Sequence, residues 1–302
     1  MMYFRMGATT RFHSWFHPLR WFRKVAFVLA VTYTCCLLMS TRSTASAQDT
    51  GNLHGVTRNA QGAPLPGARV VVKVARQHAG GSLMADLTIY LGNRNYASWS
   101  LRAWLALKAT GAAFEEVVIP LFTPGSKETL LKYSPAGKVP ALHHADIVVW
   151  DSLAICGYLA ELFPEAGLWP ADPAARAVAR SISAEMHAGF QALRREFPMN
   201  IRSRFPGREI SPEAQADTNR VMAIWRQARN RFGEHAEGDF LFGRFTIADA
   251  MYAPVATRFR TYGFDLEREA DAYCDAVIAL PAMQEWAAAA KNEPMIIDQY
   301  EF

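Results

Sequence analysis

The order of segments between residues 87 and 163 most strongly limits what this chain can fold into. Two strand-like runs, Leu87–Leu91 and Phe114–Leu121, flank a helical pattern that begins near Trp99 and stops at Gly111. A strand, helix, strand order with short connections favours a parallel βαβ unit. A short helix, two strands and a closing helix follow, over 127–133, 139–143, 146–150 and 152–163. The sequence therefore predicts an α/β half with the order β-α-β-α-β-β-α.

The remainder of the chain has a different character. Residues 164–173 form a turn-rich linker that contains Gly167 and Pro170. Beyond this linker no segment alternates convincingly like a strand, and apolar residues recur at helical spacing. The clearest helical segments are 174–197, 212–235, 245–262 and 281–291. Residues 174–302 are therefore predicted to form an all-α bundle of about five helices.

The formal net charge of +4 conceals an asymmetry along the chain. Residues 1–83 hold ten basic residues and one acid, a net charge of +9, which leaves 22 bases and 27 acids, a net charge of −5, in the remainder. Because the positive charge lies in the leader, the sequence does not predict a nucleic-acid-binding protein. The four cysteines form no Cys-x-x-Cys pair, so neither dithiol chemistry nor a metal site is expected.

Residues 1–47 have the outline of an export leader. A basic stretch, Arg20–Lys24, precedes the apolar run Val25–Met39, and Ala45-Ser46-Ala47 offers small residues in the A-x-A arrangement of a cleavage site. The run is short for a membrane span, and the segment before it is long for a signal peptide. A signal peptide and a signal anchor therefore both remain open.

Residues 48–83 are predicted to be a β-hairpin fragment and linker, because alternating segments flank a Gly- and Pro-rich turn. The fragment resembles the opening of carboxypeptidase-regulatory-like β-sandwich modules but supplies too few strands for one. Met84 follows a Gly-rich stretch and begins Met-Ala-Asp-Leu-Thr-Ile-Tyr, a natural start for a cytosolic protein. We therefore expect a cytoplasmic protein that consists of residues 84–302. If the leader is genuine, we expect the whole chain to be periplasmic or membrane-anchored instead.

Three short motifs occur in an order that resembles one protein family. Val139-Pro140 precedes a predicted strand, Asp151-Ser152 opens the closing helix, and Thr246 to Asp249 reads as a Thr-x-x-Asp capping box. Together they resemble the glutathione transferase family over residues 84–302. The resemblance implies a thioredoxin-like half over 84–163, followed after the linker by the all-helical half.

The resemblance also implies glutathione as co-substrate. In this family the peptide bond that corresponds to Val139-Pro140 is cis, and the backbone of Val139, beside Lys138, would pair with the cysteinyl part of glutathione like an added strand. The Ser152 hydroxyl and the first N–H groups of the closing helix suit the γ-glutamyl carboxylate, with Asp151 near the ammonium group.

The loop Asn95-Tyr-Ala-Ser-Trp-Ser-Leu-Arg102 resembles the place where these enzymes hold the thiol. The residue that Ser- and Cys-type relatives use falls on Ala97, so Ser98 is the first candidate for the sulfur partner and Ser100 the second. Each is also placed as a simple helix cap. Asn95, Tyr96 and Arg102 are further candidates for glutathione contacts, with fold bracing an equal alternative for Arg102.

In the helical half, the resemblance implies an electrophile pocket formed by Met186, His187, Phe190 and Arg194, although the apolar pair also suits a core. The implied reaction is attack of the glutathione thiolate on a small hydrophobic electrophile. A glutathione-dependent cis–trans isomerase of the maleylacetoacetate type and a non-catalytic glutathione-binding protein are the alternatives. The resemblance implies a homodimer. Contact with a membrane is expected only if the leader is retained.

Overall fold

The computed structural model describes residues 86–233 and 236–302. The predicted leader, 1–47, and the predicted hairpin fragment, 48–83, lie outside the described residues. Among the helices that are described, none combines the length and apolar character needed to cross a membrane.

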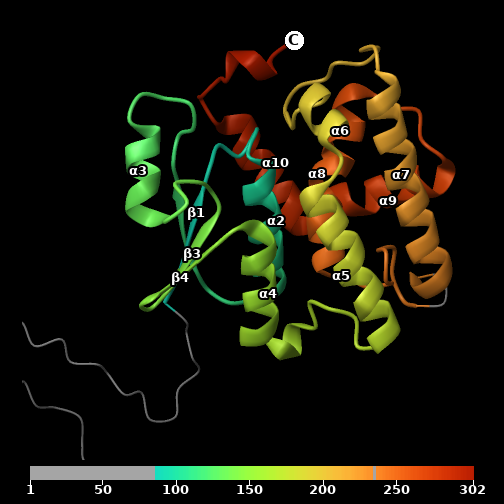
Figure 1. The fold of residues 1–302 in the computed structure, drawn as a ribbon, viewed down its shortest axis with the longest axis horizontal. Helices are drawn as coiled ribbons and strands as arrows, with labels where there is room; N and C mark the ends of the chain where they lie inside the picture. The colour runs from blue at the N-terminus through green and yellow to red at the C-terminus, as the bar shows by residue number, and fades with distance from the viewer. Residues whose placement is uncertain (1–85, 234–235) are drawn as a thin grey trace, which may run out of the picture. The chain divides into compact units, whose positions relative to one another are not determined.

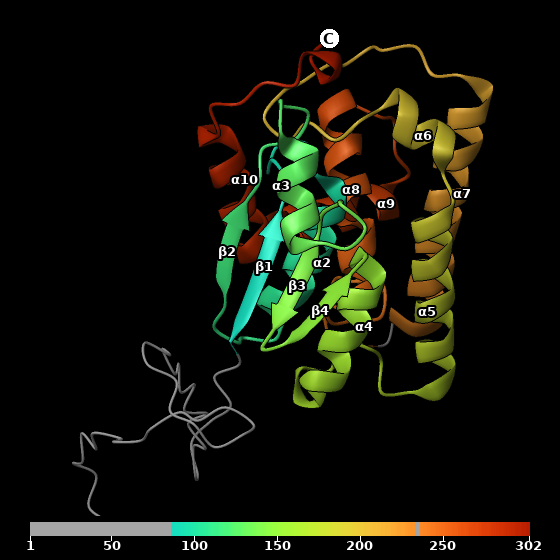
Figure 2. The same ribbon diagram turned by 60° about the vertical axis from the view of Figure 1, so that its left-hand side comes forward.

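A mixed sheet with helices on both faces occupies the first part of the described chain. Its strands are β1 (Leu87–Leu91), β2 (Glu115–Val118), β3 (Ala141–His144) and β4 (Ile147–Trp150). They lie in the order β2-β1-β3-β4; β1 is parallel to β2, and β3 is antiparallel to both of its neighbours. The sheet lies between α3 on one side and α2 and α4 on the other (Figures 1 and 2). This is the predicted thioredoxin-like arrangement, with α2 over Ser98–Ala109, α3 over Ser126–Tyr133 and α4 over Ser152–Leu162.

The second part is helical, as predicted. Its α-helices are α5 (Pro173–Ala188), α6 (Gln191–Glu196), α7 (Pro212–Ala228), α8 (Ile247–Tyr262), α9 (Arg268–Ala279) and α10 (Pro281–Asn292). The predicted continuous helix over 174–197 is wrong, because Gly189 ends α5 and Phe190, with a φ of 58°, turns the chain before α6. Glycine is a weak helix former, which explains the break at this point. The sequence pattern did not single out α9.

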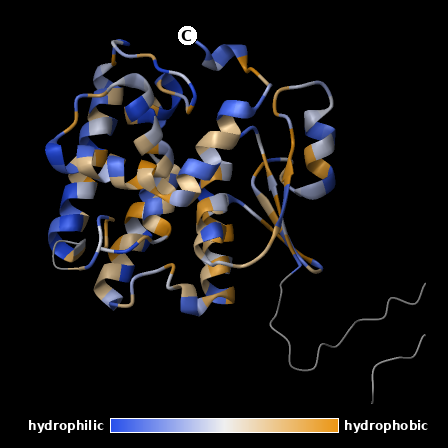
Figure 3. Ribbon diagram, turned by 180° about the vertical axis from the view of Figure 1, so that it is seen from behind, coloured by the Kyte–Doolittle hydropathy of each residue, from blue (hydrophilic) through white to orange (hydrophobic). Residues whose placement is uncertain are grey.

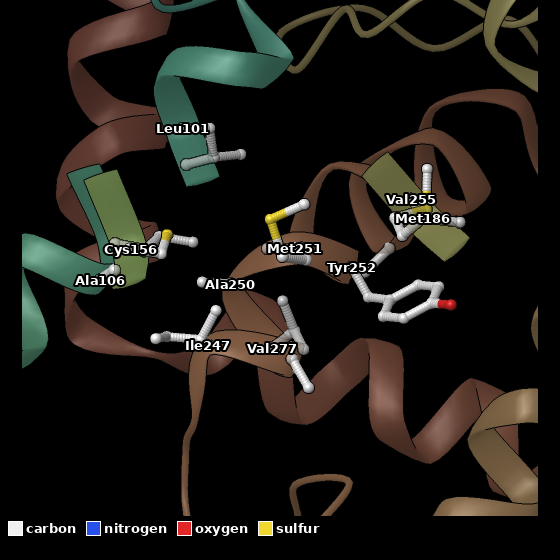
Figure 4. Packing of buried hydrophobic residues seen from close by; sticks show 14 of the residues in the cluster. Leu101, Ala106, Cys156, Met186, Ile247, Ala250, Met251, Tyr252, Val255 and Val277 are labelled. Carbon is white, nitrogen blue, oxygen red and sulfur yellow. The ribbon is translucent and has the colours of Figure 1, made fainter. Parts of the chain in front are cut away.

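The hydrophobic core is continuous across the two halves, and α8 forms its centre. Every residue of α8 except Arg260 is buried, so this helix is surrounded by protein rather than amphipathic. Around it lie Leu101 and Ala106 of α2, Cys156 of α4, Met186 of α5 and Val277 of α9 (Figure 4). Figure 3 shows the apolar residues concentrated toward the middle of the described region and the hydrophilic residues along its outer helices.

The start of α8 is fixed by a complete capping box. The buried Asp249 carboxylate accepts hydrogen bonds from the Thr246 N–H at 2.8 Å and from the Leu241 N–H at 3.0 Å. Burial raises the pKa of Asp249 to about 6, against the opposing effect of these donors. The box satisfies helix N–H groups deep in the core, so its role is structural.

Candidate functional site

Two neighbouring cavities lie on either side of Trp99 and Val139, which line both of them. The first, here called the Ser152 cavity, has a volume of about 550 Å³ and is also lined by Lys138, Pro140, Asp151, Ser152 and His187. The second, here called the Arg258 cavity, has a volume of about 500 Å³ and is also lined by Tyr96, Ser98, Arg194, Met199 and Arg258. The two cavities therefore adjoin each other at Trp99 and Val139.

The start of α4 shapes the Ser152 cavity. Asp151 is the N-cap residue, and its Oδ1 accepts a hydrogen bond from the Leu153 N–H at 3.0 Å. Ser152 is the first helical residue and is 1% exposed, yet its hydroxyl has no hydrogen-bond partner among the described residues. A buried hydroxyl without a partner is costly. Beside the N–H groups of a helix start, it fits a carboxylate of a ligand.

His187 lies at the Ser152 cavity, although the sequence analysis expected it in an electrophile pocket. Its Nε2 lies 3.3 Å from Asp151 Oδ2, and its ring meets the Trp99 ring edge-on with centroids 5.1 Å apart. Sequence spacing gave no sign of this contact because His187 belongs to α5 in the helical half. It therefore connects the helical half to the cap of α4.

Val139 precedes β3, and its peptide bond to Pro140 is cis. Within the described part of the chain, its backbone N–H and C=O make no hydrogen bond. An unpaired N–H and C=O on one extended residue can pair with a peptide-like ligand in the manner of an added strand. Lys138 and Pro140, also predicted as contacts, line the same cavity.

The start of α2 faces the Arg258 cavity. Ala97 is the N-cap residue, and its methyl group cannot accept a hydrogen bond. Ser98 is the first helical residue and therefore does not cap the helix. Ser98 lines the cavity. Ser100 does not, because its buried hydroxyl accepts a hydrogen bond from the Gly92 N–H at 3.0 Å. The first helical hydrogen bond runs from Leu101 to Ala97, and the described residues provide no partner for the Trp99 and Ser100 N–H groups.

Asn95 and Tyr96, predicted as glutathione contacts, are engaged with distant parts of the chain. Asn95 is 0% exposed and lines neither cavity; its Oδ1 accepts hydrogen bonds from the backbone N–H groups of Ile201 and Arg202. The Tyr96 hydroxyl donates to Glu301 and accepts from Arg202 at 2.7 Å. Burial and the Glu301 carboxylate raise the pKa of Tyr96. Only the edge of Tyr96 toward the Arg258 cavity is therefore available to a ligand.

Arginine side chains surround Trp99. The guanidinium carbons of Arg102 and Arg194 lie 4.4 Å and 4.5 Å from the centroid of its ring. Arg102 lines neither cavity, and it is 1% exposed with no partner for Nε and Nη1 among the described residues. Burial, together with the charges of Arg194 and Arg258, lowers the pKa of Arg102 to about 9. The Arg102 guanidinium therefore packs against the Trp99 ring.

The two apolar residues predicted for the electrophile pocket belong to the core. Met186 and Phe190 are buried in the hydrophobic cluster and line neither cavity. Arg194 does line the Arg258 cavity, next to Met199.

Cys156 is buried, and burial raises the pKa of its thiol to about 12, which suits a packing role. No metal-binding group of acidic, histidine or cysteine side chains occurs among the residues described.

Trp99, Arg258 and Tyr300 are among the cavity residues that the sequence did not indicate. Trp99, which lines both cavities, lies inside the loop 95–102, but an aromatic residue at a helix start gave no chemical signal. Arg258 is hidden in the apolar pattern of α8. Tyr300 lies 100 residues beyond Asn200, the residue whose side-chain amide donates to the Tyr300 carbonyl oxygen.

Comparison with known proteins relates both parts of the chain to one family. Residues 96–162 match the glutathione S-transferase N-terminal domain, and residues 211–289 match the C-terminal domain. The maleylacetoacetate isomerase of Rattus norvegicus is 31% identical over 182 residues, which are 59% of this chain and 80% of that protein. Glutathione S-transferase 1 of Dianthus caryophyllus is 31% identical over 185 residues, 60% of this chain and 80% of that protein.

Solved structures agree in fold. A glutathione transferase homolog from Burkholderia GL BGR1, with bound glutathione, has a TM-score of 0.53 at 24% identity and covers 69% of this chain and 100% of its own. The theta class glutathione S-transferase of Xanthomonas axonopodis pv. citri, with glutathione bound, has a TM-score of 0.51 at 22% identity, covering 67% and 97%.

A thioredoxin-like half joined to a helical half is the fold that this chain shares with the solved glutathione transferases. Identity of about 31% to relatives that this chain covers over 80% of their length goes further than the fold alone. The chain belongs to the glutathione S-transferase family and is an enzyme of that family.

Proposed function

We propose that this enzyme binds glutathione across the Ser152 cavity and joins its thiolate to a small electrophile held in the Arg258 cavity. One observation carries the proposal: the buried Ser152 hydroxyl, at a helix start beside the acidic Asp151, has no hydrogen-bond partner in the part of the chain that the structure describes. An amino acid end group, with one carboxylate and one ammonium, is the ligand that this pair of side chains matches. The relatives solved with bound glutathione support the same ligand.

The residues present fit the γ-glutamyl and cysteinyl parts of glutathione. In the proposed complex, the γ-glutamyl carboxylate accepts hydrogen bonds from the Ser152 hydroxyl, and Asp151 attracts the ammonium group. The cysteinyl backbone pairs with the free N–H and C=O of Val139. Because Val139 lines both cavities, the cysteinyl sulfur is then directed toward the start of α2.

The start of α2 supplies the groups that stabilise a thiolate. Ser98 offers a hydroxyl, and Trp99 and Ser100 offer N–H groups at the positive end of the helix dipole. Each unit by which the thiol pKa falls corresponds to about 1.4 kcal/mol of preference for the thiolate. The sulfur then attacks the electrophilic carbon and forms a carbon–sulfur bond, while the leaving group departs with the electron pair of the bond that breaks. Positioning and exclusion of water provide the rest of the catalysis.

A glutathione-dependent cis–trans isomerase is the second candidate, and the relatives named maleylacetoacetate isomerase favour it. The two candidates differ in the fate of glutathione. Conjugation consumes it. In isomerisation the thiolate adds to the double bond, the resulting single bond rotates, and glutathione leaves as the double bond re-forms. An assay with maleylacetoacetate that gives product without net loss of glutathione would select the isomerase.

The absorbance of the thiolate in the ultraviolet tests the shared core of these candidates. We expect glutathione bound to the enzyme to titrate at least about one pKa unit below free glutathione, and Ser98→Ala to raise that pKa by about one unit, because a charge-assisted hydrogen bond is lost. Ser181→Ala removes an exposed hydroxyl of α5 and is the control. Bound glutathione that titrates like the free thiol would select the non-catalytic binding protein, the third candidate.

We also propose that the protein is a homodimer, as is common in this family. The described chain leaves large apolar side chains exposed, including Ile147 and Trp150 on β4. A mass measured by light scattering that equals one chain at micromolar concentration would contradict this proposal.

For the leader we propose that residues 84–302 fold and bind glutathione without residues 1–83 and that this shorter product is cytoplasmic. The sign of the net charge changes at this boundary. Expression of both forms tests the proposal. A soluble, glutathione-binding product of 84–302 is expected; an insoluble one, with the full chain exported, cleaved after Ala47 and active, would make the leader genuine.

A further inference from the structure

The segment that follows α10 lies against the loop between β1 and α2 (Figures 1 and 2). Residues 293–301 are here called the strap. Glu293 comes directly after α10, and its carboxylate accepts hydrogen bonds from the backbone N–H groups of Arg94 at 2.9 Å and Asn95 at 3.2 Å. In α10 itself, the Trp286 indole donates to the Arg94 carbonyl oxygen at 2.8 Å. The strap and α10 therefore hold two consecutive residues of the loop.

A second carboxylate of the strap holds the next residue. Glu301 Oε1 accepts from the Tyr96 hydroxyl at 2.5 Å, and Oε2 accepts from the Ser203 hydroxyl at 3.2 Å. The Tyr96 hydroxyl in turn accepts from the Ile297 N–H at 3.3 Å. Although burial alone would raise it, the donors Tyr96 and Arg202 hold the pKa of the Glu301 carboxyl below its usual range. The carboxylate is therefore ionised at neutral pH.

Arg202 joins the two carboxylate sites. Its Nη1 donates to the Glu293 carbonyl oxygen at 3.0 Å. Its Nη2 donates to the Tyr96 hydroxyl at 2.7 Å and to the Glu301 carboxylate at 3.2 Å. The Arg202 backbone N–H also donates to Asn95 Oδ1 at 3.0 Å. One residue of the helical half therefore binds both the strap and the loop.

The loop has few contacts of its own that determine where α2 begins. Ala97 provides no side-chain cap, in contrast to Asp151 at the start of α4. The Ala97 N–H donates to the Asn93 carbonyl oxygen at 2.8 Å, and the Ser98 N–H donates to the Tyr96 carbonyl oxygen at 3.0 Å. The second of these bonds connects the first residue of α2 to Tyr96, which the strap holds.

The Tyr96 hydroxyl has no proton left for a ligand. A phenol has one proton to donate, and here Glu301 accepts it. The same oxygen already accepts from Arg202 and from the Ile297 N–H. Tyr96 therefore anchors the loop and does not donate to the sulfur.

We propose that Glu301 is a positioning residue, which acts through Tyr96 to hold the start of α2 where it stabilises the thiolate of glutathione. The inference rests on the proposed function, because the thiolate is expected at that helix start. Hydrogen bonds weaken steeply when donor and acceptor are misaligned, so donors at a site must be held to within about 0.5 Å. Glu301 lines neither the Ser152 cavity nor the Arg258 cavity, so it acts on the loop and not on the ligand.

Two substitutions separate the contacts of Glu301 from its charge. Glu301→Gln removes the charge but keeps an oxygen that can accept from Tyr96, whereas Glu301→Ala removes both. Loss of a nearby negative charge would by itself favour the thiolate and lower the thiol pKa in both variants. We expect instead that Glu301→Ala raises the pKa of bound glutathione by about half a unit to one unit, as the loss of one hydrogen bond implies, and that Glu301→Gln does not raise it. The ultraviolet absorbance of the thiolate measures both values.

S-methylglutathione distinguishes positioning of the sulfur from a general loss of structure. It keeps the γ-glutamyl and cysteinyl parts of glutathione but cannot form a thiolate. In Glu301→Ala its affinity, measured by calorimetry, should stay within about twofold of the original value. The affinity for glutathione at neutral pH should fall about threefold to tenfold, the factor that corresponds to the rise in pKa.

Tyr96→Phe tests the route of this effect. It removes the hydroxyl that Glu301 accepts and keeps the ring, so it remains informative if Glu301→Ala is poorly folded. The thiol pKa should rise as much as in Glu301→Ala, and the double variant should add little to either change. Glu285→Ala is the control, because it removes a surface carboxylate of α10 that pairs with Lys108 and lines neither cavity. It should leave the thiol pKa unchanged.

The outcomes separate this inference from the proposed function. If bound glutathione has a lowered pKa that Glu301→Ala does not change, this inference is wrong and the proposed function stands. A fall of the pKa in both Glu301 variants would mean that only the charge acts, which also overturns it. A much larger rise in Tyr96→Phe than in Glu301→Ala would show that the hydroxyl itself serves the sulfur and would contradict positioning. If bound glutathione titrates like the free thiol in the original protein, the proposed function fails, and this inference fails with it.

Discussion

The helices α2 and α4 both begin beside a cavity, yet their first turns are completed in opposite ways. At α4 the Asp151 side chain caps the helix and accepts from the Leu153 N–H. At α2 the cap position is held by Ala97, which offers no acceptor. A helix start without a side-chain cap is usually less stable by about 1 kcal/mol. The fold therefore satisfies one helix start by itself and leaves the other incomplete.

This difference assigns a separate task to each helix start. The Asp151 carboxylate accepts from the N–H of Leu153, the second residue of α4, so the hydroxyl of Ser152 is not needed as a cap and stays available to a ligand. Because Ala97 satisfies nothing, the N–H groups of Trp99 and Ser100 stay available as well. In the proposed complex the γ-glutamyl carboxylate binds the Ser152 hydroxyl at the start of α4. The thiolate accepts from the Trp99 and Ser100 N–H groups and so takes the place of the missing side-chain cap of α2.

The largest effect is expected when the residues at the start of α4 are substituted. Asp151→Asn with Ser152→Ala should weaken glutathione binding by at least about tenfold, because two charge-assisted contacts of roughly 1.5–3 kcal/mol each are lost. Asparagine still caps a helix, so α4 should remain intact. Calorimetric titration with reduced glutathione measures the change.

The control for this double variant is Asp172→Asn. Asp172 caps α5, where it accepts from the Ala175 N–H at 2.7 Å, and it lines neither proposed cavity. Its substitution should leave glutathione affinity unchanged. A folded double variant that binds glutathione as well as the original protein would remove Asp151 and Ser152 from the site.

The parts of the site that the sequence predicted are those fixed by neighbouring residues. Val139-Pro140 precedes β3 and Asp151-Ser152 opens α4, so local spacing was enough to place both pairs in the fold. Their role as glutathione contacts comes from the resemblance to the family and stays a prediction. The fold class followed for the same reason, since the order of strands and helices limits the topology.

The roles of residues whose contacts come from distant parts of the chain could not be predicted from local spacing. Asn95 and Tyr96 stand in a loop that suits ligand contacts, but their partners are Ile201, Arg202 and Glu301, about a hundred or more positions later. His187 reaches Asp151 only because the helical half folds back on α4. Contacts of this range depend on tertiary packing and leave no periodic signal.

A smaller effect is expected from placing a charge at the incomplete start of α2. Ala97→Asp puts a carboxylate where the thiolate is proposed to lie, and like charges disfavour each other, so the pKa of bound glutathione should rise by about one unit or more. The ultraviolet absorbance of the thiolate measures this. An unchanged thiol pKa, with the variant folded, would place the sulfur away from the start of α2.

The smallest effect is expected when the cap of α2 is restored without a charge. Ala97→Ser supplies a hydroxyl oxygen that can accept from the Trp99 or Ser100 N–H, so the free energy of unfolding should rise by about 0.5–1 kcal/mol in the ligand-free protein. The same N–H groups cannot fully serve both the serine and the sulfur. The additional stability that saturating glutathione gives should therefore shrink by a similar few tenths to 1 kcal/mol.

Thermal unfolding of the original protein and the variant, each with and without glutathione, gives the four values needed. Glu267→Ser is the matched control, because Glu267 holds the N-cap position of α9 without a side-chain cap bond and lies outside both cavities. It does lose the surface contact to Arg226, which contributes little in water. A cap gained there should act equally with and without glutathione. If Ala97→Ser behaves the same way, the ligand does not use the start of α2, and the two helix starts differ for a reason unrelated to the thiol.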